Sequence, residues 1–217
     1  MLPLPPPPTT TGQRVAQRRY DEAKGSQPER LATGSDDFTI FLWEPAVNNK
    51  PLTRMTGHQQ PINLLSYSPD GRLLASASFD KSLKLWNGQT GKYVGSEALI
   101  RSIDVRQPTN QLNARRFIST LRGHVGAVYQ VCWSADSRMI VSGSSDSTLK
   151  VWDLRTNKLK LDLPGHADEV FSVDWSPDGE RVASGAKDKV VKMYVRGTRA
   201  RTELCHRANK SLCSWQS

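Results

Sequence analysis

Cysteine is scarce in this 217-residue chain, and its three copies form an odd number: Cys132, Cys205 and Cys213. Such a count, without regular spacing, does not indicate the disulfide framework of a small secreted domain. Cys205-His206 with Cys213 is only a weak metal-binding pattern, so we expect no metal and no cofactor. The chain starts with prolines instead of a basic region followed by an apolar run, so we expect no signal peptide.

Long apolar runs and catalytic motifs are also missing. No stretch of about 18 apolar residues occurs, so we expect no membrane helix, and an intracellular compartment fits. The sequence has no phosphate-binding loop, no nucleophile motif and no metal cluster. It therefore predicts neither an enzyme nor a protein with a small-molecule substrate.

Repeated short motifs are the main positive feature. The dipeptide Gly-His occurs three times, at Gly57-His58, Gly123-His124 and Gly165-His166. Each copy precedes a run in which an aspartate is followed six residues later by an aromatic residue, and a fourth run lacks the Gly-His. The aspartates of the four runs are Asp37, Asp80, Asp146 and Asp188. They lie 43, 66 and 42 residues apart, and two of these intervals match a four-stranded repeat of roughly 40–45 residues.

Strand and turn patterns occupy each repeat. Val128–Trp133 is apolar and aromatic, 134–137 is a turn, and 148–152 alternates with period two. The turns at 68–71 and 176–179 read Ser-Pro-Asp-Gly. In such a turn proline presets φ, aspartate bonds its local backbone and glycine accepts positive φ. No stretch inside the repeats has helical periodicity, so we expect an all-β chain.

Serine, histidine and aspartate recur together, which raises the question of catalysis. A nucleophilic triad needs a single assembly with an oxyanion hole and an exposed serine. Here the constellation occurs in triplicate with a structural spacing. We therefore expect a structural role for these residues and no enzymatic activity.

Gly-His, Ser-x-Asp and Trp at these spacings resemble the WD-repeat family, whose members fold as β-propellers. The resemblance implies one hydrogen-bonded tetrad of His, Ser or Thr, Asp and Trp in each repeat. On this sequence the tetrads are His58/Ser76/Asp80/Trp86, His124/Ser142/Asp146/Trp152, His166/Ser184/Asp188 with Tyr194 replacing Trp, and an incomplete Thr33/Asp37/Trp43. In such a network aspartate holds a histidine N–H and turn amides, and serine and the indole complete it.

The predicted fold is all-β, a partial WD-repeat propeller of about four blades that forms the C-terminal half of a larger propeller. Propellers typically have 4–8 blades, and the first repeat lacks its Gly-His. We expect blades over 30–194, with a looped-out insertion at about 95–116 and an outer strand at 117–122 that restores the register. A Pro-rich, polar leader over 1–29 and a basic tail over 195–217 are expected to be disordered.

The net charge of +9 suggests a nucleic-acid partner at first sight. However, the repeats at 31–94 and 120–194 carry only +1 between them, and the other segments carry +8. Any attraction to phosphate therefore comes from the appendages, which leaves RNA contact within a larger particle open.

A closer resemblance, to the C-terminal half of the Notchless family of WD-repeat proteins, covers about 30–94 and 119–194. It rests on stretches at 28–31, 34–39, 41–43, 55–59, 75–81, 133–138, 142–150 and 162–170. The resemblance implies a nuclear, largely nucleolar factor for assembly and maturation of the large ribosomal subunit. Members bind pre-ribosomal particles through an eight-bladed propeller. They contact midasin through a ubiquitin-like domain that these residues do not include, so the midasin contact is not carried over.

The leading hypothesis is thus a non-enzymatic scaffold with protein partners. The alternatives are an adaptor in signalling or ubiquitin ligation, and a truncated isoform without full activity. Candidate partner-binding residues stand just before each tetrad aspartate, at turns near one rim: Asp36, Phe79, Ser145 and Lys187. Phe79 is the strongest of these candidates, because an aromatic side chain at a turn often faces a partner.

Overall fold

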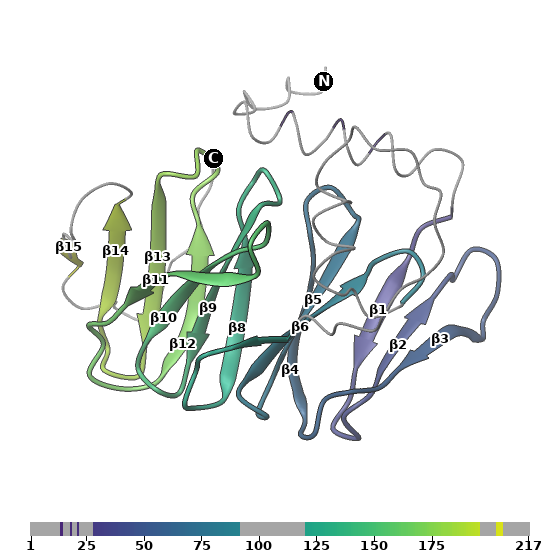
Figure 1. Cartoon of the computed structure of the whole chain (residues 1–217), viewed down its shortest axis with the longest axis horizontal. Helices are drawn as coiled ribbons and strands as arrows, with labels where there is room; N and C mark the ends of the chain where they lie inside the picture. The colour runs from purple at the N-terminus through teal and green to yellow at the C-terminus, as the bar shows by residue number, and fades with distance from the viewer. Residues whose placement is uncertain are drawn as a thin grey trace, which may run out of the picture.

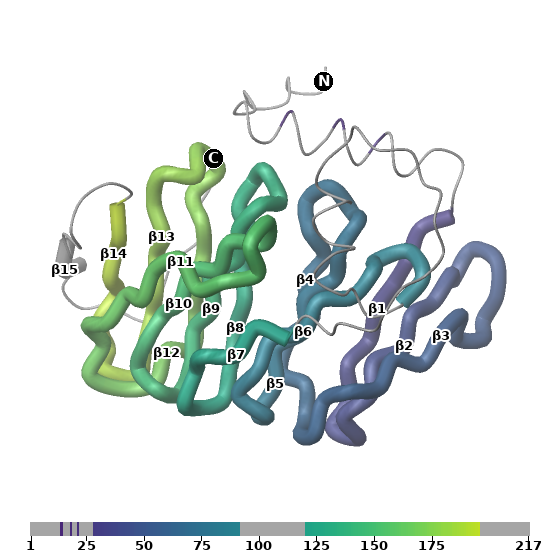
Figure 2. Tube along the Cα trace, in the orientation of Figure 1, coloured from purple at the N-terminus to yellow at the C-terminus, as the bar shows by residue number. Residues whose placement is uncertain are grey.

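Four antiparallel sheets lie side by side in an arc in the computed structural model (Figure 1). The structure describes residues 28–91 and 120–195, the backbone of 203–205 and the isolated positions Arg14, Arg18 and Asp21. Figure 2 traces the chain from the first sheet at one end of the arc to the fourth at the other.

The first sheet has three strands in the described part of the chain, and each of the others has four. The first consists of β1 (Leu31–Gly34), β2 (Ile40–Trp43) and β3 (Pro51–Met55). The second consists of β4 (Ile62–Tyr67), β5 (Leu73–Ser78), β6 (Ser82–Asn87) and β7 (Thr120–Arg122). The third consists of β8 (Val128–Trp133), β9 (Met139–Ser144), β10 (Leu149–Asp153) and β11 (Lys158–Leu163). The fourth consists of β12 (Val170–Trp175), β13 (Arg181–Ala186), β14 (Val191–Val195) and β15 (Glu203–Cys205).

Strands follow chain order within each sheet, and β4, β8 and β12 contact one another in turn. These three strands are therefore the innermost strands of their sheets. The expected all-β fold is confirmed by this arrangement.

Apolar cores lie between the sheets, because alternating residues of the middle strands point to opposite faces. Between the first and second sheets, Ile40, Leu42 and Met55 pack with Leu74 and Trp86. The second and third sheets share a larger cluster, which includes Leu83, Leu85, Ile140 and Trp152. A cluster between the third and fourth sheets includes Leu149, Val151, Val182 and Tyr194. Stacking neighbours is therefore what buries each sheet.

The turn between the second and third strand positions of each repeat has one backbone conformation throughout. The residue after each tetrad aspartate has positive φ: Phe38 at 69°, Lys81 at 66°, Ser147 at 66° and Lys189 at 64°. This left-handed region costs a non-glycine residue on the order of 1 kcal/mol. In every repeat the aspartate Oδ1 accepts the N–H of the residue two positions later, at 3.0–3.1 Å. These hydrogen bonds hold the turn in its strained conformation.

Two segments expected to lie outside the blades fall largely outside the described residues. These are the insertion at 95–116 and the leader over 1–29. Of the expected outer strand at 117–122, residues 120–122 form β7 and pair with β6. The described part of the chain contains no helix long and apolar enough to span a membrane.

Part of the expected basic tail differs from the prediction of disorder. Glu203–Cys205 forms β15 and pairs antiparallel with β14, which gives the fourth sheet its outer strand (Figure 1). The physical reason is that β14 presents backbone N–H and C=O groups along its outer edge. Such an edge is a template for pairing with another strand through backbone hydrogen bonds.

Candidate functional site

Histidine, serine, aspartate and tryptophan meet in the third sheet. His124 Nδ1 lies 2.9 Å from Asp146 Oδ2, and His124 Nε2 lies 2.8 Å from Ser142 Oγ. Trp152 Nε1 donates to the same Ser142 oxygen at 2.9 Å. In the second sheet the equivalent contacts of His58, Ser76, Asp80 and Trp86 measure 2.7, 2.6 and 2.9 Å. The sequence-predicted residues are therefore brought together in both sheets.

One assignment of protons satisfies every group in the third-sheet network. Trp152 Nε1–H donates to Ser142 Oγ, Ser142 Oγ–H donates to His124 Nε2, and His124 Nδ1–H donates to the carboxylate of Asp146. In this series of hydrogen bonds the His124 ring is neutral. Burial lowers the pKa of His124, and likewise that of His58, although the adjacent aspartates act in the opposite direction.

The aspartate also holds the turn and the loop before the innermost strand. Asp146 Oδ2 accepts Val125 N–H at 2.9 Å, and Asp146 Oδ1 accepts the Thr148 hydroxyl at 2.6 Å. Burial acts to raise the pKa of Asp146, but hydrogen bonds from Thr148, Val125 and His124 outweigh it and hold this pKa at about 2. The carboxylate is thus a fixed structural acceptor.

The fourth and first networks are incomplete. His166 contacts Asp188 at 2.9 Å and Ser184 at 2.7 Å, but the buried Tyr194 Oη, although close to Ser184, makes no hydrogen bond of normal geometry in the described part of the chain. Tyr194 therefore occupies the tryptophan position without replacing the indole donor. The first network is Thr33, Asp37 and Trp43, in which Trp43 Nε1 donates to Thr33 Oγ1 at 3.0 Å. Among the described residues, Asp37 forms hydrogen bonds only within its own turn.

Burial decides what these networks can do chemically. Ser76, Ser142 and Ser184 are 0%, 0% and 2% exposed, so no substrate reaches their hydroxyls. Cys132 contacts Asp174 Oδ1 at 3.3 Å, and burial raises the pKa of its thiol to about 12, which makes it a poor nucleophile. Among the described residues, no three metal-ligating side chains lie close enough to hold an ion, and the pattern of Cys205, His206 and Cys213 lies outside the described side chains.

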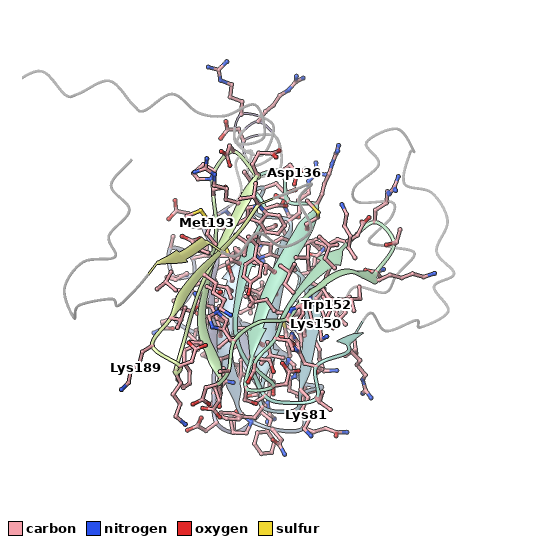
Figure 3. The ribbon with its side chains drawn as sticks, turned by 90° about the vertical axis from the view of Figure 1, so that its left-hand side faces the viewer. Lys81, Asp136, Lys150, Trp152, Lys189 and Met193 are labelled. Atoms are coloured by element: carbon pink, nitrogen blue, oxygen red, sulfur yellow. The ribbon has the colours of Figure 1, made fainter. Side chains whose placement is uncertain are left out.

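The residues before the tetrad aspartates lie at one rim. Figure 3 shows Lys81 and Lys189, two of the residues that follow these aspartates, at one end of the sheets and Asp136 at the other. Three backbone hydrogen bonds join this rim to the segments before the innermost strands. They are Phe79 N–H to Pro61 O at 3.1 Å, Ser145 N–H to Ala127 O at 2.9 Å, and Lys187 N–H to Glu169 O at 2.9 Å. Asp36, Phe79 and Lys187 are exposed, and Ser145 is half-buried.

An aromatic row crosses this rim, formed by Phe79, Tyr129 and Phe171 of the second, third and fourth sheets. Phe79 meets Tyr129 edge to face with ring centroids 6.0 Å apart, and Tyr129 stacks on Phe171 at 5.1 Å. An ion pair borders the row, since Glu169 Oε2 lies 3.6 Å from Lys187 Nζ and Glu169 Oε1 lies 3.4 Å from Tyr129 Oη. The row therefore joins an apolar strip to polar groups.

Sequence reasoning found Phe79 but missed Tyr129 and Phe171. Both are skipped in the pairing register, because β8 bulges between Val128 and Gln130 and β12 bulges between Val170 and Ser172. A bulge re-aims the side chain of the extra residue. The available signal was a break in alternation, Val-x-x-Val, which occurs at the start of both strands.

Comparison with known proteins agrees with this geometry. A family model described as the CAF1B/HIR1 beta-propeller domain matches residues 14–216. The chain is 57% identical over 88 residues to the Notchless protein homolog of Arabidopsis thaliana, covering 41% of this chain and 18% of that protein. It is 48% identical over 87 residues to ribosome assembly protein 4 of Saccharomyces cerevisiae, covering 39% of this chain and 17% of that protein.

A third relative is WD repeat-containing protein 1 of Xenopus tropicalis, 34% identical over 136 residues, which are 63% of this chain and 19% of that protein. The chain thus spans less than a fifth of the length of each of these relatives. The family model, by contrast, extends over all four sheets. Its coverage and the repeated networks lead to one conclusion: the chain belongs to the CAF1B/HIR1 beta-propeller domain family, a WD-repeat type of propeller.

Proposed function

We propose that this chain is a non-enzymatic interaction scaffold for assembly of the large ribosomal subunit, and that it binds a protein component of pre-ribosomal particles through the aromatic row. The observation that carries the proposal is the row itself. Phe79 is 40% exposed and Phe171 is 48% exposed, although both rings already contact Tyr129.

Aromatic rings in such a setting are suited to binding a partner. They offer a large apolar area at little conformational cost, and the contacts between them hold the row in place before binding. Glu169 and Lys187 supply hydrogen-bonding groups at its margin. An apolar centre with a polar border is the usual composition of a protein interface.

The biological setting comes from the relatives. Two of them are named ribosome assembly protein 4 and one a Notchless protein homolog. By resemblance to these relatives we propose a location in the nucleus and nucleolus. Any contact with RNA inside the particle would be made by the basic segments outside the repeats, because the repeats are nearly neutral.

The test is co-sedimentation of the tagged full chain with pre-large-subunit particles on a density gradient. Phe79→Ala is expected to shift most of the chain to the free fractions, since alanine removes the exposed ring at one end of the row. Phe38→Ala is the matched control, because Phe38 is also 40% exposed at an equivalent turn but belongs to the first sheet and lies outside the row.

Circular dichroism must show that both variants stay folded. Equal loss by Phe79→Ala and Phe38→Ala would argue against the aromatic row as the binding site. Recovery of only free wild-type protein would argue against the ribosomal role.

A further inference from the structure

Certain apolar residues are buried wherever two neighbouring sheets meet. Their equivalents on the outward faces of the first and fourth sheets, at the two ends of the arc, are exposed or only half-buried. At each junction the forward face of one sheet packs on the rear face of the next. We define the forward face by the residues three and five positions after the tetrad aspartate, and the rear face by the residues six positions before and six after it. These positions belong to the three apolar clusters between the sheets.

The rear face is open in the first sheet. Six residues before the aspartate, Leu74, Ile140 and Val182 are 1%, 0% and 6% exposed, whereas Leu31 is 52% exposed. Six residues after it, Trp86, Trp152 and Tyr194 are 2%, 2% and 4% exposed, whereas Trp43 is only half-buried. The first sheet therefore presents a rear face without a described neighbour that buries it.

This rear face is also more apolar than its internal counterparts. Four residues after the aspartate, the second, third and fourth sheets carry lysine, at Lys84, Lys150 and Lys192. The first sheet carries Phe41 at that position, and its ring lies 6.0 Å from that of Trp43. An aromatic pair in place of lysine and tryptophan favours contact with another apolar face.

The forward face is open in the fourth sheet. Three residues after the aspartate, Ile40, Leu83 and Leu149 are at most 1% exposed, and five residues after it, Leu42, Leu85 and Val151 are at most 4% exposed. Their fourth-sheet equivalents, Val191 and Met193, are only half-buried. Figure 3 looks onto this end of the arc, with Met193 labelled on β14.

We propose that a second copy of this chain closes the arc, the forward face of each fourth sheet packing on the rear face of the partner's first sheet. Each copy offers one open face of each kind, and all three internal junctions already join these two kinds of face. The four described sheets do not close into a ring, because the first and the fourth lie at opposite ends of the arc (Figures 1 and 2).

A ring of two copies also fits the symmetry expected of a contact between two unlike faces. A contact between unlike faces forms a ring when its rotation closes and a filament when it does not. Two copies of four sheets give a ring of eight, within the range of 4–8 blades seen in propellers. Both junctions of the ring are the same, so the dimer buries all four open faces at once.

Sedimentation equilibrium of the full chain tests the ring. The expected mass is twice 24.2 kDa, falling toward a single chain on dilution. A single chain at every concentration would overturn the proposal. A mass that keeps growing with concentration would overturn it too, since it would mean a filament in place of a ring.

Two variants distinguish head-to-tail packing from other dimers. Leu31→Asp blocks the rear face of the first sheet and Met193→Asp blocks the forward face of the fourth, so each variant alone is expected to be monomeric. An equimolar mixture keeps one intact junction, and it is expected to form a mixed dimer. If either variant alone still dimerises, or if the mixture stays monomeric, the head-to-tail arrangement is wrong.

Controls separate loss of association from loss of fold. Val47→Asp changes another exposed apolar residue, 67% exposed in the turn after β2, and is expected to leave the dimer intact. Phe41→Lys installs the residue that the other three sheets carry, so the fold should accept it. We expect Phe41→Lys to raise the dissociation constant of the dimer roughly tenfold, because an aromatic side chain is lost from the interface. The circular dichroism spectrum should stay unchanged. An unchanged dissociation constant would count against the first-sheet face.

Discussion

The first and third sheets carry the same kind of hydrogen bond in different surroundings. Trp43 donates to Thr33 at 3.0 Å, and Trp152 donates to Ser142 at 2.9 Å. Yet Thr33 is exposed while Ser142 is completely buried. A bond between neighbouring strands thus forms without burial, and the difference lies in what surrounds it.

What surrounds Ser142 is a histidine and a preceding sheet. His124 comes from the segment before β8 and reaches both Ser142 on β9 and Asp146 in the following turn. The second sheet covers the network with its apolar face. The comparison teaches that histidine converts a local bond into a link between three segments, and that a neighbouring sheet removes the solvent that would compete for it.

The largest expected difference between the two sheets follows removal of the aspartate. Asp146→Ala leaves His124 Nδ1–H and the N–H of Val125 without their acceptor, and we expect a loss of about 3 kcal/mol in the free energy of unfolding. Asp37→Ala should cost clearly less, because the Asp37 side chain is exposed and no histidine among the described residues depends on it as an acceptor; it holds only the backbone N–H and the hydroxyl of Thr39. Urea unfolding of both variants measures the difference, and equal losses would contradict it.

A smaller effect is expected from pH. The folded pKa values of His58 and His124 are lowered, so the unfolded chain takes up protons more readily than the folded one below the ordinary histidine pKa of about 6.5. Stability is therefore full above that value and declines as pH falls through it. Asp80 and Asp146, whose folded pKa values are also lowered, extend the decline below the ordinary aspartate range.

Urea midpoints between pH 7.5 and pH 5 check this dependence. The variant His124→Gln should flatten the curve over this interval, because one of the linked protons is removed. A slope that stays as steep as in the wild type would show that other groups control it.

The smallest expected effect is a gain in the fourth sheet. Tyr194→Trp supplies the missing indole donor to Ser184 and is expected to add about 1 kcal/mol, the typical contribution of one hydrogen bond. Gly165 lies next to the Tyr194 hydroxyl as Gly123 lies next to the Trp152 ring, so the same backbone position borders both side chains. Thermal unfolding measures the gain. The reverse change, Trp152→Tyr, is the matched control and should destabilise the chain; if both changes act in the same direction, the donor is not the deciding factor.

Much of the fold is predictable from the sequence because the spacing of the repeated motifs shows where each strand and turn falls. The spacing of Asp37, Asp80, Asp146 and Asp188 places one turn in each of four sheets, and the structure has these turns at those positions. The residues expected to share each network are brought together because strand pairing places Ser142 opposite Lys150, two residues from Trp152. Local pattern and long-range pairing agree at these sites.

The remainder depends on contacts that sequence spacing does not encode. Tyr129 and Phe171 reach the rim through bulges in β8 and β12. The Val-x-x-Val break in alternation marks each bulge in the sequence, but it does not show where the extra side chain points. The β15 strand forms by backbone pairing, which carries little signal in its side chains. The candidate site was therefore predicted through Phe79 and missed in its two neighbours.

The residue after each tetrad aspartate has the same left-handed backbone conformation in all four repeats, although the amino acid differs between them. Phenylalanine, lysine, serine and lysine occupy one backbone conformation, with φ between 64° and 69°. The conformation is set by the aspartate and its turn, so the side chain at this position is free of any role in shaping the backbone. Four surface positions can thus change their chemistry without any change in architecture, which gives a repeated fold a way to acquire distinct surfaces one repeat at a time.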